Sequence, residues 1–207
     1  VLLSGTLLVP SDARFAPDGR RVVFLASETD PSVTELFAAP LDGSAAPVKL
    51  SGALVAGGDV QRDFEIGADG ARVVYPADQG ANERFELYSA PLDGTRGSVK
   101  LNPTPVAGNV IEFRVDPAGG RVAYRADHGR RGTFELYSAP SDGNQPAVKL
   151  NPTLERDRGI YPNLVELAAL IVENLVLHGR LGPALPVLAA LRQQLNVDDK
   201  EYPDRRE

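Results

Sequence analysis

Three stretches of the chain repeat one another and decide its fold. They read RVVFLASETDPSVTELFAAPLDG at residues 21–43, RVVYPADQGANERFELYSAPLDG at 72–94 and RVAYRADHGRRGTFELYSAPSDG at 121–143. Each is followed by the triplet VKL, which begins at Val48, Val99 and Val148. The copies recur about every 50 residues, a period typical of repeat architectures. We therefore expect three copies of one structural unit.

Each unit contains four short segments with strand character. A first strand, such as residues 63–66, ends in a turn that reads PDG at 17–19, ADG at 68–70 and PAG at 117–119. The second strand, RVVF, RVVY or RVAY, has consecutive apolar residues, as expected for a strand that is buried on both faces. A third strand, ELF or ELY, precedes a Pro-x-Asp-Gly turn, and VKL forms the fourth. Four antiparallel strands in such a unit, stacked on the next unit, indicate a β-propeller blade.

These residues resemble the TolB-like propeller repeats of bacterial proteins, most of which are envelope-associated or secreted. The recurring element of that family is a Ser-Pro-Asp-Gly turn, an apolar strand, an Ile/Leu-Tyr strand and a second Asp-Gly turn. Here the first turn reads APDG at 16–19, GADG at 67–70 and DPAG at 116–119, so it has diverged. The resemblance covers residues 1 to about 153 and implies the fold, but it does not specify a function. No catalytic or binding residue of the family maps onto this chain.

Three blades are too few for a closed ring, because known propellers have about four to eight. The sequence VLLSG at 1–5 aligns with VKLSG at 48–52, so residues 1–3 look like the last strand of a preceding blade. The chain starts at Val1 and has no methionine, which favours a processed form or part of a longer reading frame. Three explanations stay open: a fragment of a longer array, several chains that complete a ring or stack, or a C-terminal cap.

The sequence pattern changes after Pro162 to one rich in leucine and alanine. We expect one helix over about 163–178, which ends at Gly179, and a second over about 183–195. Gly179, Ala184, Leu188 and Leu191 resemble the inner part of a tetratricopeptide repeat, although a single copy is fewer than such an array needs. The predicted αα-hairpin therefore either caps a blade or binds a partner.

Composition excludes several classes of function. The chain has 22 Lys and Arg against 28 Asp and Glu, and its net charge of −6 argues against nucleic-acid binding. It has no cysteine, so disulfides and thiolate chemistry are excluded. The most apolar stretch, residues 164–177, contains Glu166, Glu173 and Asn174 and is too short to span a membrane. We expect no membrane insertion.

The candidates for site chemistry are few. Asp78 and Asp127 recur in register within loops, but the spacing of a calcium loop is missing, so we interpret both as residues of solvated loops. His128 and His178 lack a nucleophile motif, and we interpret both as structural. The cluster of Arg125, Arg130 and Arg131 is interpreted as solvated. We also expect Tyr75, Tyr88, Tyr124 and Tyr137 in the blade cores, because they recur at strand positions.

These observations predict a mainly β chain with propeller blades over 1–153, starting near 13, 62 and 111, and a helical hairpin with a charged tail over 154–207. The predicted function is a non-catalytic protein-binding or self-assembly module, with no cofactor, no metal and no enzymatic activity. The alternatives are an accessory segment of a larger envelope or secreted enzyme and a subunit of an extracellular polymer. We expect a protein partner, either another copy or a longer propeller array, and a periplasmic or extracellular location. The candidate interaction residues are Val1, Leu2, Leu3, Leu167, Leu170, Ile171, Leu188 and Leu191.

Overall fold

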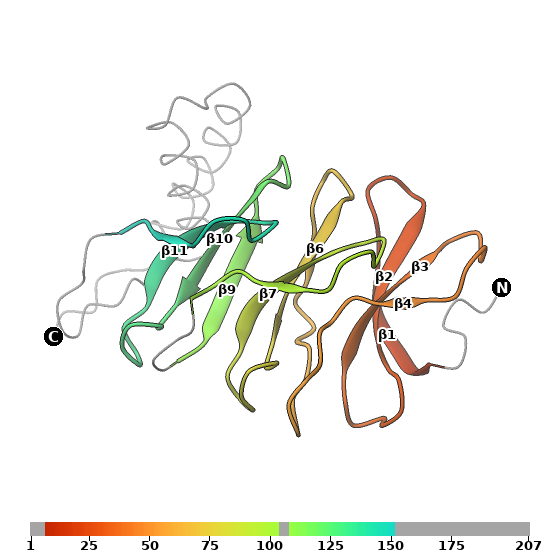
Figure 1. The fold of residues 1–207 in the computed structure, drawn as a ribbon, viewed down its shortest axis with the longest axis horizontal. Helices are drawn as coiled ribbons and strands as arrows, with labels where there is room; N and C mark the ends of the chain where they lie inside the picture. The colour runs from red at the N-terminus through yellow and green to blue at the C-terminus, as the bar shows by residue number, and fades with distance from the viewer. Residues whose placement is uncertain (1–6, 104–107, 152–207) are drawn as a thin grey trace, which may run out of the picture. The chain divides into compact units, whose positions relative to one another are not determined.

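The computed structural model describes residues 7–103 and 108–151. These residues form three four-stranded antiparallel sheets that lie side by side (Figure 1). Within each sheet the strands follow one another in chain order. The predicted mainly β fold with three four-stranded blades is therefore confirmed. The predicted strand at residues 1–3, the helical hairpin and the charged tail lie outside the described residues.

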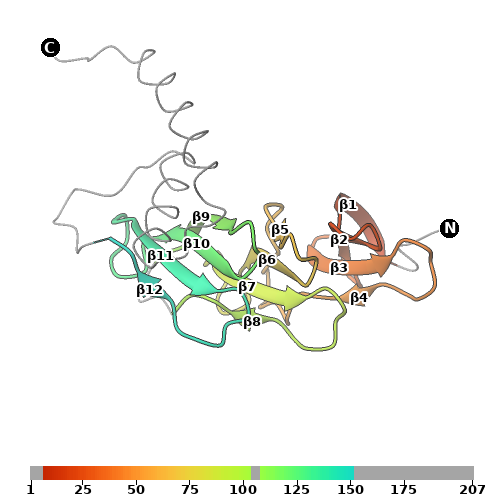
Figure 2. The ribbon, with the colours of Figure 1, turned by 90° about the horizontal axis from the view of Figure 1, so that it is seen from above.

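The strands have the following bounds. Blade 1 contains β1 (Leu8–Phe15), β2 (Arg21–Ser27), β3 (Glu35–Pro40) and β4 (Val48–Lys49). Blade 2 contains β5 (Glu65–Ile66), β6 (Arg72–Ala77), β7 (Glu86–Pro91) and β8 (Val99–Lys100). Blade 3 contains β9 (Val110–Val115), β10 (Arg121–Ala126), β11 (Glu135–Pro140) and β12 (Val148–Lys149). The first strands, β1, β5 and β9, lie along one side of the sheets, and the last strands, β4, β8 and β12, lie along the other (Figure 2).

The turn between the first and second strand requires glycine in every blade. Gly19, Gly70 and Gly119 have φ angles of +65°, +66° and +75°, a region that residues with a Cβ atom rarely adopt. The recurrence of glycine in the sequence thus follows from the backbone conformation of the turn.

An aromatic pair lies at the centre of each blade. Phe24 is directly opposite Phe37, Tyr75 opposite Tyr88, and Tyr124 opposite Tyr137. The ring centroids of these pairs are 6.1, 6.0 and 5.3 Å apart. All six side chains are buried, so the prediction that the four tyrosines belong to the blade cores is confirmed.

Each blade has two faces, which we name by their neighbours. The leading face carries the aromatic pair and, in blades 2 and 3, packs against the preceding blade; the trailing face of blades 1 and 2 packs against the following blade. In blade 1 the trailing face consists of Val23, Leu25, Leu36 and Ala38, which share one apolar cluster with Tyr75 and Tyr88 of blade 2. A second cluster joins Val74 and Leu87 of blade 2 to the leading face of blade 3. The core therefore lies between the sheets.

The first strands differ more than the sequence repeat indicates. β1 has eight residues, two register shifts against β2, and Asp12 with a φ of +47°. β5 has only two residues, fewer than the predicted 63–66, and Phe64 directly before it is buried between blades 1 and 2. A bulged strand twists more strongly than a regular one, so the first strand of blade 1 departs from the geometry of its counterparts.

Candidate interaction surfaces

Backbone contacts between neighbouring blades repeat in register. At the first joint the Thr34 amide donates to the Asp59 carboxylate at 2.6 Å, and the Val60 amide donates to the Thr34 carbonyl at 2.9 Å. At the second joint the same two bonds connect Phe85 with Asn109 and Val110, both at 2.8 Å. The interface between blades is therefore a repeated unit, like the blades themselves.

The last strand of each blade carries a valine, and in blades 1 and 2 this valine packs against a turn of the following blade. A Cβ atom at Gly94 would lie 3.0 Å from Val48, and one at Gly143 would lie 3.0 Å from Val99. These two valines thus pack closely against the glycine turn of the following blade. Their counterpart in blade 3, Val148, is 56% exposed. This position on β12 is available for a further contact.

The arginine at the start of the second strand of blade 2 belongs to the same interface. The Arg72 guanidinium donates to the Ser89 hydroxyl at 2.9 Å and to the Ser141 carbonyl of blade 3 at 3.0 Å. On blade 3, Arg121 donates to the Ser138 hydroxyl at 3.1 Å in the same way. Blade 3 therefore retains the arginine–serine pair that blade 2 uses to contact the following blade.

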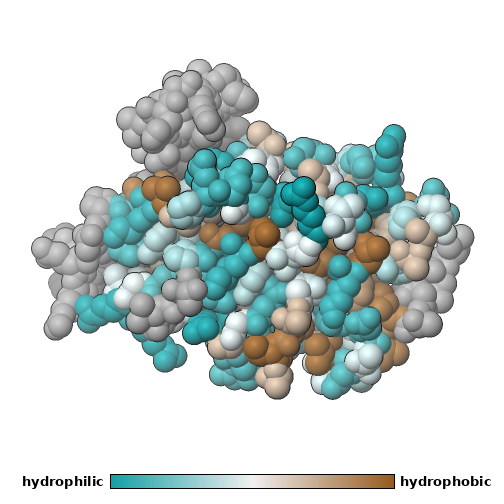
Figure 3. Space-filling view, viewed as in Figure 1, coloured by the Kyte–Doolittle hydropathy of each residue, from teal (hydrophilic) through white to brown (hydrophobic). Residues whose placement is uncertain are grey.

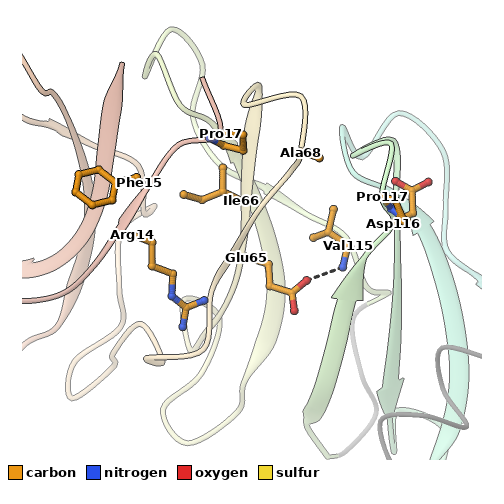
Figure 4. A pocket seen from close by; sticks show the side chains of 9 residues that line it. All are labelled: Arg14, Phe15, Pro17, Glu65, Ile66, Ala68, Val115, Asp116 and Pro117. Carbon is orange, nitrogen blue, oxygen red and sulfur yellow. Dashed lines mark hydrogen bonds between the residues drawn. The ribbon is translucent and has the colours of Figure 1, made fainter. Parts of the chain in front are cut away.

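A groove of about 360 Å³ runs along the turns of the first strands (Figure 4). Equivalent positions of the three blades supply its apolar part, namely Phe15, Ile66 and Val115, and Phe15 is 72% exposed. Figure 4 shows the Ile66 side chain between the other two. The chain therefore presents an apolar line across all three blades.

Charged side chains beside the groove connect the blades. The Arg14 guanidinium donates to the Phe64 carbonyl and lies 4.3 Å from the centre of the Phe64 ring. Glu65 accepts hydrogen bonds from Arg114 at 2.9 Å and from the Val115 amide at 2.7 Å. Burial raises the pKa of Glu65, although both bonds oppose that shift. These groups hold the first strands together, which the sequence interpretation missed. The signal is the alternation Arg14, Glu65 and Arg114 at equivalent positions.

The loop aspartates differ from their prediction. Asp78 and Asp127 are buried, so their interpretation as residues of solvated loops is wrong. The Asp127 carboxylate accepts hydrogen bonds from the Asn109 amide at 2.6 Å and the Gly132 amide at 2.8 Å. Asp78 bonds the amides of Asp59 and Glu83 in the same manner. Both side chains therefore hold loop backbones.

The remaining sequence candidates are distributed as follows. His128 is buried, whereas His178 lies outside the described residues. Arg130 and Arg131 are exposed, as predicted, but Arg125 is largely buried and lies 3.5 Å from Glu112. In residues 7–103 and 108–151, no three His, Cys, Asp or Glu side chains gather as metal ligands would. The predicted interaction residues all lie outside the described residues: Val1, Leu2, Leu3, Leu167, Leu170, Ile171, Leu188 and Leu191.

The surface in the view of Figure 3 shows apolar side chains as scattered patches among hydrophilic ones. The described part of the chain contains no helix that is long and apolar enough to cross a membrane.

Comparison with known proteins identifies structural neighbours only. No family model matches the chain, and neither does any curated protein. A solved structure described as TolB from Agrobacterium tumefaciens is 15% identical and has a TM-score of 0.45, with 70% of this chain and 50% of that chain covered. A prolyl endopeptidase is 14% identical with a TM-score of 0.47 and coverages of 69% and 19%. An oligogalacturonate lyase in complex with manganese is 14% identical with a TM-score of 0.44 and coverages of 75% and 39%.

At these identities the likeness concerns the fold alone. The three four-stranded sheets agree with the predicted blades, and the chain is similar to the structure described as TolB. The chain spans half or less of the length of these three structures. The tetratricopeptide-like hairpin stays a prediction.

The expectation that the chain is not an enzyme is corrected. Its structural neighbours include a prolyl endopeptidase and an oligogalacturonate lyase, so the fold gives no ground for excluding catalysis.

Proposed function

We propose that the chain is a protein-binding or self-assembly module built from propeller blades, and that the side of blade 3 facing away from blade 2 receives its partner. The observation that carries this proposal is the exposure of Val148. Val48 and Val99, at the same position, both contact the glycine turn of a following blade. A third copy of this contact residue supports a further blade-like partner.

A second copy of this chain supplies the matching element. The turn of blade 1 at residues 40–43 corresponds to the turns that contain Gly94 and Gly143, and Gly43 has the same positive φ, +69°. That turn borders an open hollow of about 650 Å³. Two chains with three blades each would have six blades, a number within the range of about four to eight in known propellers.

Light scattering of the full chain over a series of concentrations tests the proposal. The variants are Val148→Glu and, as a matched control, Ile111→Glu at an exposed apolar position of β9. We expect assemblies for the wild type and for Ile111→Glu. Val148→Glu should weaken association by roughly tenfold or more, because it replaces the valine contact with the Gly43 turn by a carboxylate whose desolvation costs over about 1.4 kcal/mol. A wild-type chain that stays monomeric at every concentration contradicts self-assembly through this side.

The same exposed side supports two other arrangements that the sequence left open. One is an accessory segment of a larger envelope or secreted enzyme, and the other is the subunit of an extracellular polymer. An adjoining hydrolase domain in the complete reading frame would support the accessory segment. An open series of masses would support the polymer, whereas a single assembled species would support a ring. The periplasmic or extracellular location belongs to these proposals.

A further inference from the structure

His128 occupies an unusual position at the joint between blades 2 and 3. The residue is buried, with only 5% of its surface exposed. Its ring packs against both tyrosines of the leading face, with its centroid 5.8 Å from that of Tyr124 and 5.4 Å from that of Tyr137. Among the described residues neither ring nitrogen has a hydrogen-bond partner, and neither does the Tyr124 hydroxyl. Buried polar atoms usually have such partners, so the unpaired state of these three atoms, the two His128 nitrogens and the Tyr124 hydroxyl oxygen, needs an explanation.

The charged groups around His128 are already paired with one another. On blade 2, Glu86 accepts bonds from Lys100 at 3.1 Å and from the Tyr88 hydroxyl at 2.9 Å. On blade 3, Glu135 accepts bonds from Lys149 and from the Tyr137 hydroxyl. Asp127 holds two backbone amides. An imidazolium ion at this position would therefore be buried without a carboxylate that is committed to it.

Burial lowers the pKa of His128 below its ordinary value of 6.5. The negative charges of Asp127 and Glu86 oppose this shift, and the positive charge of Lys100 adds to it. The folded chain therefore binds a proton at this site less readily than the unfolded chain does. Stability from the neutral imidazole is complete above pH 6.5 and is lost as the pH falls from 6.5 through the lower pKa of the folded chain.

The His128 loop is connected directly to the joint. Asp127, the preceding residue, bonds the Asn109 amide, and the Asn109 side chain accepts the Phe85 amide of blade 2. The Val110 amide then donates to the Phe85 carbonyl. A displacement of the His128 loop would therefore disturb the hydrogen bonds that join blade 3 to blade 2.

We propose that His128 makes the joint between blades 2 and 3 sensitive to acid, so that its protonation opens this joint and not the joint between blades 1 and 2. The equivalent position in blade 2 is Gln79, which does not titrate, and in blade 1 it is the exposed Glu28. The first joint therefore lacks a histidine at this place. A neutral His128 packs against the two tyrosines, whereas a protonated His128 gains a second N–H donor and a charge that the joint cannot satisfy.

Hydrogen exchange of the full chain between pH 8 and pH 5 tests the proposal. After correction for the intrinsic pH dependence of exchange, the Val110 amide of the second joint should exchange faster in acid, by up to about tenfold per pH unit for one proton. The Val60 amide of the first joint is the internal control and should change less. His128→Gln copies the residue of blade 2 and should remove the difference between the two joints. Gln79→His should transfer acid sensitivity to the first joint.

Three results would overturn the proposal. The first is equal acceleration at both joints in the wild type, and the second is an unchanged difference in His128→Gln. The third needs no variant: an imidazole resonance of His128 that titrates at or above its ordinary pKa in the native chain.

Discussion

The leading face of blade 1 and the trailing face of blade 3 are the two ends of the described repeat, and they differ in polarity. The leading face of blade 1 carries a buried apolar cluster of Val22, Phe24, Ala26, Phe37 and Ala39, beside which Glu35 and Lys49 form an ion pair. Its aromatic pair even lacks the hydroxyl groups of the tyrosines in blades 2 and 3. The trailing face of blade 3 instead carries Arg125 and Ser138, where blade 1 has Leu25 and Ala38.

This difference shows that the two ends of a repeat array can carry faces of different polarity. Apolar area removed from water contributes roughly 25 cal/mol per Å², so the leading face of blade 1 gains most from dry packing. Arg125 pairs with Glu112 and lies 5.6 Å from the centre of the Phe134 ring. A charged group either stays hydrated or, when it is buried in an interface, needs a partner of opposite charge or a hydrogen bond. A partner of blade 3 therefore has to match a more polar face than any joint inside the described chain.

The largest effect is expected from removing residues 1–5 at the N-terminal end. If these residues donate a strand to a neighbouring chain, their deletion removes the main-chain hydrogen bonds of that contact and abolishes assembly. Light scattering of the truncated and full chains measures the result. Assemblies of unchanged mass would contradict strand donation and would leave the Val148 side as the contact to test.

Phe24→Ala should lower the free energy of unfolding by about 3–5 kcal/mol, because it leaves a cavity in the leading face of blade 1. Ser138→Ala on the opposite end is the matched comparison and should cost about 1 kcal/mol through the lost bond from Arg121. Denaturant unfolding of both variants measures the difference. Equal losses would show that the two ends contribute alike to stability.

Arg125→Leu makes the trailing face of blade 3 resemble that of blade 1. We expect self-association to become stronger by about tenfold, which corresponds to about 1.4 kcal/mol, because apolar area replaces a charge. The double variant Arg125→Leu and Glu112→Gln controls for the carboxylate that loses its partner. Sedimentation over a concentration series gives the constants. Weaker association in both variants would mean that Arg125 itself binds the partner.

Tyr75→Phe gives blade 2 the residue that blade 1 has at Phe24. The Tyr75 hydroxyl donates to the Leu50 carbonyl at 3.4 Å, so the variant should lose about 1 kcal/mol or less at neutral pH. Burial raises the pKa of Tyr75 to about 12 from 10.0, so the wild type loses stability as the pH rises through this range. The variant lacks this loss, so the stability advantage of the wild type should shrink as the pH rises above 10 and then reverse, because two pKa units correspond to about 2.7 kcal/mol. A wild-type advantage that grows with pH would contradict the burial of a neutral hydroxyl.

Much of the blade was predictable because its signals are local. Gly19 and Gly70 occur where the turn needs a positive φ, and consecutive apolar residues mark the buried second strands. The loop aspartates were misjudged for the opposite reason. Asp78 lies in a segment whose composition is typical of a solvated loop. Its carboxylate is nevertheless buried and accepts hydrogen bonds from the amides of residues 59 and 83. The charge of a residue and its place in a loop do not reveal that its carboxylate accepts hydrogen bonds from two backbone amides.

The repeat, its period and the four-strand pattern of each blade were determined by the sequence, because periodicity and turn residues act over a few neighbouring positions. Only the tertiary structure decided that Glu65 pairs with Arg114, that Arg72 reaches Ser141, and that the buried His128 lies against Tyr124 and Tyr137. The first two contacts join different blades. They depend on the distance and rotation between whole sheets, which no local pattern of residues specifies.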